Sequence, residues 1–307
     1  MARRRKGKVV NGWLVLDKPT GMTSTHVVNV VRRLFDARKA GHAGTLDPLA
    51  TGLLPIAFGE ATKTINYAVD GTKGYAFTIR WGAATTTDDS EGEVIATSER
   101  RPTIAEVEAR LEAFTGEIEQ VPPKFSAIKI DGQRAYDLAR DGADVELAAR
   151  PVTIHALRVV DQPDDDHTIL EAACGKGTYV RAIARDLGVA LGCYGHVTQL
   201  RRTRVGAFDV AGAVTLSDLE ARADAGTALE VLLPMAAALE ELAEIAMTAN
   251  DVGRIRRGQA VILRGRDAPV SADAAYATLK GELVALGEIS QGAFVPNRVF
   301  NAPAATG

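Results

Sequence analysis

The sequence predicts an α+β fold followed by a small C-terminal β-barrel. The chain has 307 residues, and single hydrophobic cores stop growing near ~250–300 residues, so we expect two domains. Candidate strands and helices are mixed without the regular βαβ rhythm of a doubly wound sheet, which favours the α+β class. Near the C-terminal end, short apolar pieces separated by glycine and polar turns are typical of a barrel of about 60 residues.

The expected elements begin with a strand at residues 13–16. Thr23 or Ser24 can then cap a helix whose apolar side chains, from Val27 to Leu34, recur on one face. Residues 75–81 alternate large with small or polar side chains, which predicts a half-buried strand. These elements would start a mixed sheet with a helix against it.

Further elements are expected between residues 103 and 191. Thr103 and Glu106 have the spacing of a capping box at the start of an apolar helix. Residues 125–130 are a strand candidate and residues 133–140 a short-helix candidate. Residues 178–191 predict a longer helix with one apolar face.

A change in pattern near residue 240 predicts a domain boundary, with a first unit at residues 1–238 and a second at 239–303. The apolar and acidic stretch before residue 247 leads to a helix start at Thr248. The strand candidates that follow are residues 260–263, 275–277, 283–287 and 293–295. Their spacing and turns are typical of a small barrel.

The net charge of −3, from 36 Lys+Arg and 39 Asp+Glu, argues at first against a nucleic-acid-binding protein. The charges are unevenly distributed, however. Basic residues are in excess in residues 1–40, 176–206 and 252–266, and acidic residues in 85–120 and 216–251. Each basic run alone fits an ordinary solvated face. Three of them in a near-neutral chain favour one surface that faces a polyanion.

Several classes of protein lack support. No apolar run approaches the ~20 residues that span a bilayer, and the run after the basic start is too short for an export signal, so we expect a cytoplasmic protein without membrane attachment. Cys174 and Cys193 are isolated, and the five histidines show no ligand spacing. Without an HExxH, Walker A or GxGxxG motif, we expect no metal and no other cofactor.

A glycine-punctuated segment, residues 41–63, carries the candidate chemistry. Asp47 lies within it, and the Asp47-Pro48 pair could simply start a helix. The surroundings are apolar, though, and a carboxylate there needs a partner or a task. Arg181 is a candidate partner, because a helix dipole disfavours a cation in the first turn. An exposed arginine paired with another acid is the alternative.

Four segments in this order resemble the TruB family of tRNA pseudouridine synthases: Lys18–Ser24, Gly41–Gly52, Gly59–Lys63 and Gly177–Arg181. The motif Gly-x-Leu-Asp-Pro-x-Ala-Thr-Gly is highly specific. The resemblance runs from about residue 12 to residue 204 and includes Thr85, Thr87, Asp89, Gly92 and residues 120–129. From about residue 240 the chain resembles a PUA-type RNA-binding domain more weakly.

The resemblance implies a mixed-sheet pseudouridine synthase catalytic domain with a PUA-like C-terminal domain. A flexible RNA-binding insertion at about residues 120–150 would close over the T loop of tRNA. The implied reaction converts uridine 55 of that loop to pseudouridine: the N1–C1′ bond breaks, the base turns, and C5 rejoins C1′. No cofactor, metal or obligate protein partner is implied, and we expect a monomer.

The resemblance also implies a catalytic set. Asp47 would be the catalytic carboxylate, acting either covalently on the sugar or through a glycal-type route. Arg181 would pair with Asp47, lower its pKa and fix its direction. Tyr75 would stack on the target base and could take the C5 proton, although alone it could be an ordinary strand aromatic. Phe125 stands where the family pattern has Tyr, which removes one hydroxyl contact.

Five further residues would bind the substrate if the resemblance holds. Tyr179 and Leu200 would line the base pocket, and His42 would fill the space left when the T loop opens. Lys18 and Lys63 would meet backbone phosphates. From sequence alone, Leu200 is as easily a core residue, His42 a surface or core histidine, and the lysines solvated side chains.

Three other functions are open to such a chain. A guide-RNA-dependent pseudouridylase subunit would share the fold, but those relatives usually carry longer basic tails and lack the loop at residues 120–150. An RNA chaperone without chemistry would not need the set formed by Asp47, Arg181 and Tyr75. An aspartate-based hydrolase would need a second carboxylate at a glycosidase-like spacing, which is not recognisable here.

Overall fold

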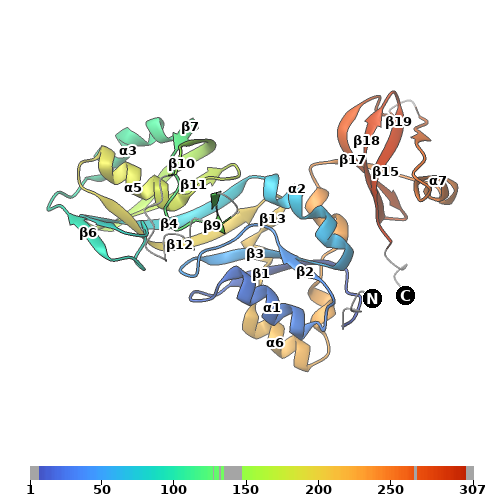
Figure 1. The fold of residues 1–307 in the computed structure, drawn as a ribbon, viewed down its shortest axis with the longest axis horizontal. Helices are drawn as coiled ribbons and strands as arrows, with labels where there is room; N and C mark the ends of the chain where they lie inside the picture. Colours follow the sequence, from blue (N-terminus) through green and yellow to red (C-terminus); the bar gives the residue numbers. More distant parts are fainter. Residues whose placement is uncertain (1–6, 127, 131–132, 135–146, 266–267, 302–307) are drawn as a thin grey trace.

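In the computed structural model, the described residues are 7–126, 128–130, 133–134, 147–265 and 268–301. They form a large mixed sheet flanked by helices and a smaller C-terminal sheet, joined by the chain near residue 240 (Figure 1). No helix within these ranges is long and apolar enough to cross a membrane. This arrangement agrees with the predicted α+β class.

The larger sheet has ten strands in the described residues, and its main path runs β14-β1-β3-β12-β4-β11-β10-β7, with β2 on β3 and β13 on β12. Strand β3 is antiparallel to β1 and parallel to β12, so the sheet is mixed. The strands of this sheet are β1 (Gly12–Lys18), β2 (Ala40–His42), β3 (Thr51–Phe58), β4 (Lys73–Trp81), β7 (Gly116–Gln120), β10 (Arg150–Asp164), β11 (His167–Cys174), β12 (Gly195–Val205), β13 (Phe208–Asp209) and β14 (Val214–Thr215).

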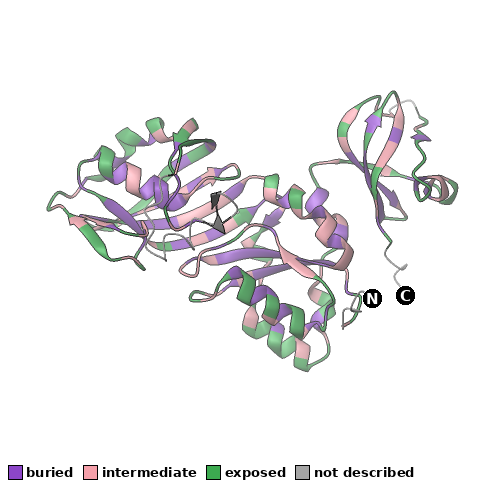
Figure 2. Ribbon diagram, in the orientation of Figure 1, coloured by how far each residue is buried: buried purple, intermediate pink, exposed green. Residues whose placement is uncertain are grey.

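Helices cover both ends of this sheet. Helices α3 and α5 lie together at one end, and α1 and α6 lie at the other end, near β1 (Figure 1). Within the described ranges the helices are α1 (Ser24–Leu34), α2 (Ile65–Asp70), α3 (Ile104–Leu111), α5 (Val180–Ala190), α6 (Leu216–Asp224) and α7 (Ala249–Ile255). The short 3-10 turns are η1 (Gly59–Thr64), η2 (Glu112–Phe114), η3 (Val210–Gly212), η4 (Ala228–Val231) and η5 (Met235–Leu239). The central strands are largely buried, whereas the outer faces of the helices are exposed (Figure 2).

The C-terminal sheet has the strand order β15-β17-β18-β19-β16 in the described residues. Its strands are β15 (Ala243–Ala246), β16 (Val261–Ile262), β17 (Ala272–Leu279), β18 (Glu282–Ser290) and β19 (Ala293–Val299). This curled sheet is consistent with the predicted PUA-like barrel. One buried apolar cluster joins it to the larger sheet, since Leu286 and Phe300 pack in the same cluster as Trp13 and Leu239.

The predicted local signals are mostly confirmed. Thr23 caps α1 by accepting a hydrogen bond from the backbone N–H of His26, and capping boxes start α3 at Thr103 and α7 at Thr248. The predicted strand at residues 75–81 is β4, and the predicted helix at 178–191 is α5.

One local prediction was wrong in the described residues, and a second is tested at two residues only. Residues 125–126 lie in a bend, so only Lys129–Ile130 (β8) of the predicted strand is extended. Of the predicted helix at 133–140, Gln133–Arg134 form a strand (β9) instead, while residues 135–140 lie outside the described ranges and the helix there stays a prediction. Strand β8 pairs only with β9. Strands β5 (Ala83–Thr85) and β6 (Val94–Thr97), which form the other two-stranded sheet, were not anticipated.

Candidate active site

A cavity of about 640 Å³ opens where β4 and β12 meet the loop before β3 and the start of α5. It is lined by backbone and side chains from segments far apart in the sequence. Five of the predicted site residues line it: Asp47, Tyr75, Tyr179, Arg181 and Leu200. A carboxylate, a guanidinium and two phenol rings therefore share one concave space with apolar walls, which is a typical binding-site composition.

Asp47 lies in the irregular loop between β2 and β3. No helix follows it, so the helix-cap interpretation of Asp47-Pro48 is wrong. Its own carbonyl accepts a hydrogen bond from the backbone N–H of Ala50 at 3.1 Å, which closes a turn. The turn leaves the Asp47 side chain free to point at the cavity, where it remains 36% exposed.

The loop around Asp47 is held by partners from β1 and α1. The hydroxyl of Ser24, at the start of α1, accepts from the Leu46 backbone N–H at 2.8 Å and donates to the Leu46 carbonyl at 3.0 Å. The Pro48 carbonyl accepts from the backbone N–H of Gly21 at 2.8 Å and from Nζ of Lys18 at 3.3 Å. Both neighbours of Asp47 are thus fixed, which limits the directions its carboxylate can take.

Arg181 lies in the first turn of α5, as predicted, and its side chain is 5% exposed. Its Nη2 atom lies 3.0 Å from Oδ2 of Asp47, and its Nη1 atom lies 3.3 Å from Oδ2 of Asp89. It also donates to the carbonyls of Thr87 at 2.8 Å and Phe125 at 2.9 Å. A cation disfavoured by the helix dipole is therefore stabilised by two carboxylates and two carbonyls.

The pKa of Asp47 lies above its ordinary value of 3.8. Burial is the largest cause, because a low-dielectric site penalises the charged form, and the nearby charge of Asp89 acts in the same direction. Arg181 lowers the pKa of Asp47, as expected, but does not outweigh burial. The site thus holds a carboxylate whose proton affinity is raised and whose direction is set by an arginine.

Tyr75 and Leu200 form one wall of the cavity. Tyr75 on β4 lies opposite Arg202 on β12, and Leu200 lies opposite Phe77 two positions along the same ladder. Burial raises the pKa of Tyr75. Because strand side chains alternate between faces, Leu200 and Arg202 share the cavity face of β12.

Tyr179 is held at the cavity mouth by Gln120, the last residue of β7. The Gln120 side chain accepts from the Tyr179 backbone N–H at 2.8 Å and donates to its carbonyl at 3.2 Å. Gln120 is only 2% exposed, so these two bonds satisfy a buried amide. They also fix the residue that immediately precedes α5, two positions before Arg181.

Three predicted binding residues lie elsewhere. Lys18 is fully buried, and its Nζ atom donates to the carbonyls of Pro19, Met22 and Pro48, so it is not placed to meet a phosphate. Burial lowers the pKa of Lys18 to about 8. His42, at the end of β2, is not among the residues that line the cavity.

Lys63 lies at the junction of the two sheets. Its Nζ atom is 2.6 Å from Oε2 of Glu60, donates to the Val299 carbonyl at 2.9 Å and lies 5.2 Å from the centroid of the Phe300 ring. The structure therefore gives Lys63 partners in the C-terminal part of the chain. A phosphate contact for Lys63 remains a prediction without support from this placement.

Sequence reasoning missed three contributors to the site. Asp89 was noted within the resemblance but not as a partner of Arg181, Gln120 was not singled out as the anchor of Tyr179, and Arg202 was counted only as a surface charge. Each acts through tertiary contacts across more than 50 residues of chain. The family-like segments that contain Asp89 and Gln120 were the signals that could have identified two of them.

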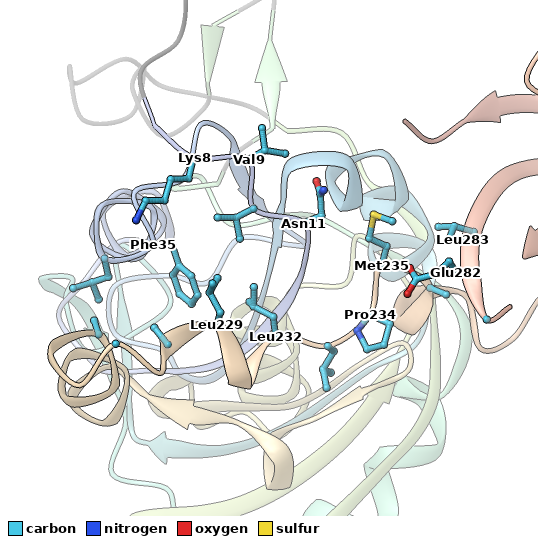
Figure 3. Close-up of a pocket in the computed structure, with 18 residues that line it drawn as sticks. Lys8, Val9, Asn11, Phe35, Leu229, Leu232, Pro234, Met235, Glu282 and Leu283 are labelled. Atoms are coloured by element: carbon cyan, nitrogen blue, oxygen red, sulfur yellow. The ribbon is translucent and has the colours of Figure 1, made fainter. Parts of the chain in front are cut away.

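A second cavity, of about 680 Å³, lies between the start of the chain, the segment around Leu229–Met235 and the turn before β18 (Figure 3). Its labelled side chains are mainly apolar, with Glu282 and Lys8 at its margins. It contains none of the predicted site residues. The cavity at Asp47 is therefore the candidate active site.

Solved structures with this fold define the class. A crystal structure of a Cbf5–Nop10–Gar1 complex matches with a TM-score of 0.72 and 25% identity, covering 95% of this chain and 85% of that chain. An H/ACA RNP bound to a substrate RNA containing 2′-deoxyuridine matches with a TM-score of 0.73 and 22% identity, covering 98% and 92%. The second likeness concerns the fold alone. The mixed sheet is that of the pseudouridine synthase fold.

Sequence comparisons identify the family. A model described as TruB family pseudouridylate synthase (N terminal domain) matches residues 32–180, and one described as tRNA pseudouridylate synthase B C-terminal domain matches 181–240. A protein named tRNA pseudouridine synthase B from Bradyrhizobium diazoefficiens is 57% identical over 97% of this chain and 88% of that protein. One of the same name from Caulobacter vibrioides is 54% identical over 98% and 99%. The chain belongs to the TruB family.

Proposed function

We propose that this protein converts uridine 55 in the T loop of tRNA to pseudouridine, with Asp47 as the catalytic carboxylate. The observation that carries the proposal is the contact between Asp47 and Arg181 at 3.0 Å inside a cavity with aromatic and apolar walls. Such a site can take a base out of solvent and present a directed carboxylate to its sugar. The names of the relatives support tRNA as the substrate.

The reaction needs an ionised carboxylate beside C1′ of the target nucleotide. Asp47 would attack C1′ or assist loss of the 2′ proton in a glycal route, and either path breaks the N1–C1′ bond. The freed base turns and C5 bonds to C1′, which breaks the bond between Asp47 and C1′ in the first route and is accompanied by return of a proton to C2′ in the second. The C5 proton then leaves and N1 takes a proton. Arg181 would hold Asp47 in its reactive direction, so that little reorganisation is needed at the moment of reaction.

The remaining cavity residues would bind the base. The target base lies inside folded RNA, and its extrusion costs a few kcal/mol. Tyr75 would offset part of that cost by stacking, and it would also help to remove the C5 proton. Tyr179 and Leu200 would enclose the base from the mouth and the β12 wall. His42 would act outside the cavity, in the space that the T loop vacates.

We further propose that separate parts of the chain carry out catalysis and tRNA binding. Residues 1–238 would form the catalytic domain, the insertion at about 120–150 would close over the T loop, and residues 239–303 would form a PUA-like domain that binds another part of the tRNA. The protein would act in the cytoplasm as a monomer without a guide RNA. The curated relatives, named as tRNA-modifying synthases, support that choice over a guide-dependent subunit.

The substitution Asp47→Asn tests the proposal. It keeps the size of the side chain and removes the charge, so turnover should fall below detection while tRNA binding changes by less than about three-fold. Tritium release from C5-labelled tRNA transcript measures turnover, and filter binding measures affinity. Asp165→Asn, on an exposed turn between β10 and β11, is the matched control and should keep full activity. Near-normal turnover by Asp47→Asn would refute the assignment.

Mapping the product tests the position. Wild-type protein incubated with unmodified tRNA should yield pseudouridine at position 55 and at no other uridine. A transcript with cytidine at that position should bind but release no tritium. Modification at another position would reject uridine 55 as the substrate while leaving the synthase activity intact.

A further inference from the structure

We propose that Arg202 is a positioning residue that ties the Tyr75 hydroxyl to the glycine-rich segment carrying Asp47. The inference rests on the proposed function of that cavity and adds a residue to it. Arg202 lies on β12, two positions after Leu200, and lines the same cavity. Its role would be to keep the base-stacking wall and the carboxylate loop in a fixed relationship.

Arg202 is a buried cation without a carboxylate partner among the described residues. It is 1% exposed, and its side chain enters no ion pair in that part of the chain. Arg201, the residue before it, shows the usual arrangement, with two bonds to the Asp17 carboxylate at 3.0 and 2.6 Å. Burying a guanidinium without an acidic partner costs free energy unless its N–H groups are hydrogen-bonded. We therefore expect Arg202 to have hydrogen-bond acceptors and a structural or functional role.

The guanidinium of Arg202 satisfies its donors on the loop that leads to Asp47 and on β3. Nη2 donates to the Gly44 carbonyl at 3.0 Å, Nη1 to the Thr45 carbonyl at 3.4 Å, and Nε to the Leu53 carbonyl at 2.9 Å. These acceptors lie on both sides of Asp47 in the sequence. One planar side chain therefore spans the two ends of the catalytic segment.

The same side chain also lies next to Tyr75 on the neighbouring strand β4. Tyr75 lies directly across the ladder from Arg202 and lines the same cavity, and the nearby guanidinium of Arg202 opposes the rise that burial causes in the pKa of Tyr75. A tyrosine ring that stacks on a base keeps a fixed orientation more easily when a neighbouring side chain restrains its hydroxyl group. Arg202 provides that hold from a position that is itself fixed by three carbonyls.

The glycines at the two ends of the motif support this packing independently. Gly44 has φ of +94°, and a Cβ there would lie 3.2 Å from Nη1 of Arg202. Gly52 has φ of +93° and pairs with Arg202 across parallel strands, where a Cβ would lie 2.3 Å from the Arg202 carbonyl. Gly44 therefore leaves room for the Arg202 side chain, and Gly52 leaves room for the backbone of β12 at the same residue.

A double-mutant cycle in single-turnover assays tests the coupling. Arg202→Met should lower the rate of pseudouridine formation on the order of 100-fold, as expected for a displaced catalytic segment, with tRNA affinity changed by less than about three-fold. In the Tyr75→Phe background the same substitution should cost at least about five-fold less, because the shared hydroxyl contact is already gone. Independent, multiplicative effects would overturn the proposal.

Arg202→Lys tests the same role if the Arg202→Met variant does not fold. Lysine keeps the charge but lacks the planar fork, so it should fold and bind tRNA yet recover less than about a tenth of the wild-type rate. Full activity of Arg202→Lys would show that a positive charge or a side chain of similar volume is sufficient at this position. It would overturn the positioning role. Arg201→Met, on the neighbouring position, is the control and should stay within about two-fold of wild type.

These outcomes can be told apart from failure of the proposed function. If wild-type protein forms no pseudouridine, or if Asp47→Asn remains active, the function itself is wrong. If wild type is active and Asp47→Asn is inactive while the Arg202 variants keep the wild-type rate, only the positioning role of Arg202 is wrong.

Discussion

Arg181 lies 3.0 Å from Asp47 even though it stands in the first turn of a helix, where the dipole disfavours a cation. The same guanidinium is shared with Asp89 and with two backbone carbonyls. Because its bonds come from several sides, its direction is fixed before any substrate arrives. The main consequence for Asp47 is therefore orientation, since burial still keeps the pKa of the carboxyl raised.

The raised pKa of Asp47 predicts an acid limb in the pH profile of kcat/KM. Activity that needs the ionised form should fall as pH decreases through that pKa, which lies above 3.8. Arg181→Met removes the cation that opposes burial, so the limb should move to higher pH and the plateau rate should fall on the order of 100-fold. Tritium release across pH 5–9 measures both effects. A limb that keeps its wild-type position in Arg181→Met would contradict the assignment of the limb to Asp47.

Asp89→Asn should shift the same limb in the opposite direction. The negative charge of Asp89 raises the pKa of Asp47, so its removal lowers that pKa and extends activity toward acid. The substitution also breaks a buried pair with Arg181 and should destabilise the fold by about 3 kcal/mol. Thr87→Val is the control, since it removes the 2.5 Å hydrogen bond to Asp89 but leaves the charge. A limb shifted equally by both variants would rule out the charge effect.

Lys18 is predicted to give the wild-type protein a pH-dependent stability. Its folded pKa is lowered from 10.5 to about 8, so the folded state binds fewer protons than the unfolded state between these values. Its contribution to the free energy of unfolding is thus smallest below pH 8 and rises toward pH 10.5, by on the order of 3 kcal/mol.

Urea unfolding of wild type and Lys18→Met at pH 7 and pH 10 measures this contribution. The free energy of unfolding of wild type should rise relative to that of Lys18→Met at the higher pH. Titration of the groups that both proteins share cancels in this comparison. An equal difference at both values would mean that the ammonium of Lys18 is not desolvated in the folded state. Lys63→Met, whose parent side chain is partly exposed, serves as the lysine control.

Local signals predicted much of the fold because they depend on neighbours in the chain. Thr103 and Thr248 carry their capping partners three residues away, and the strand at residues 75–81 shows its own alternation. Strand β15 was missed, since the stretch that contains it is apolar and acidic without alternation and becomes extended through pairing with β17. Local pattern cannot report such a tertiary contact.

Charge along the sequence was a weaker guide. The basic run at residues 176–206 was expected to face a polyanion, but Arg181 and Arg202 are buried. Arg185 pairs with Asp88 and Asp186, and Arg201 pairs with Asp17. Many of these basic side chains therefore form contacts within the protein or line the cavity, and are not free to face a polyanion. A count of basic residues cannot distinguish these cases, because the acids and carbonyls that pair with them are distant in sequence.

The salt dependence of tRNA binding separates two roles for Lys63. Phosphate contacts release counterions, so wild-type affinity should fall steeply between ~50 and ~200 mM salt. If Lys63 met a phosphate, Lys63→Met would reduce the slope of log K against log salt by about one. Its contacts with Glu60, Val299 and Phe300 predict instead an unchanged slope and a looser junction between the sheets.

Filter binding at five salt concentrations and thermal unfolding of Lys63→Met together decide the matter. We expect parallel salt plots for wild type and variant, with a lower melting temperature for the variant because a partly buried ion pair and a cation–π contact are lost. Glu60→Gln should lower the melting temperature in the same way, since Glu60 also accepts from the backbone N–H of Asn301 at 2.9 Å. A reduced slope with unchanged melting would restore the phosphate role of Lys63.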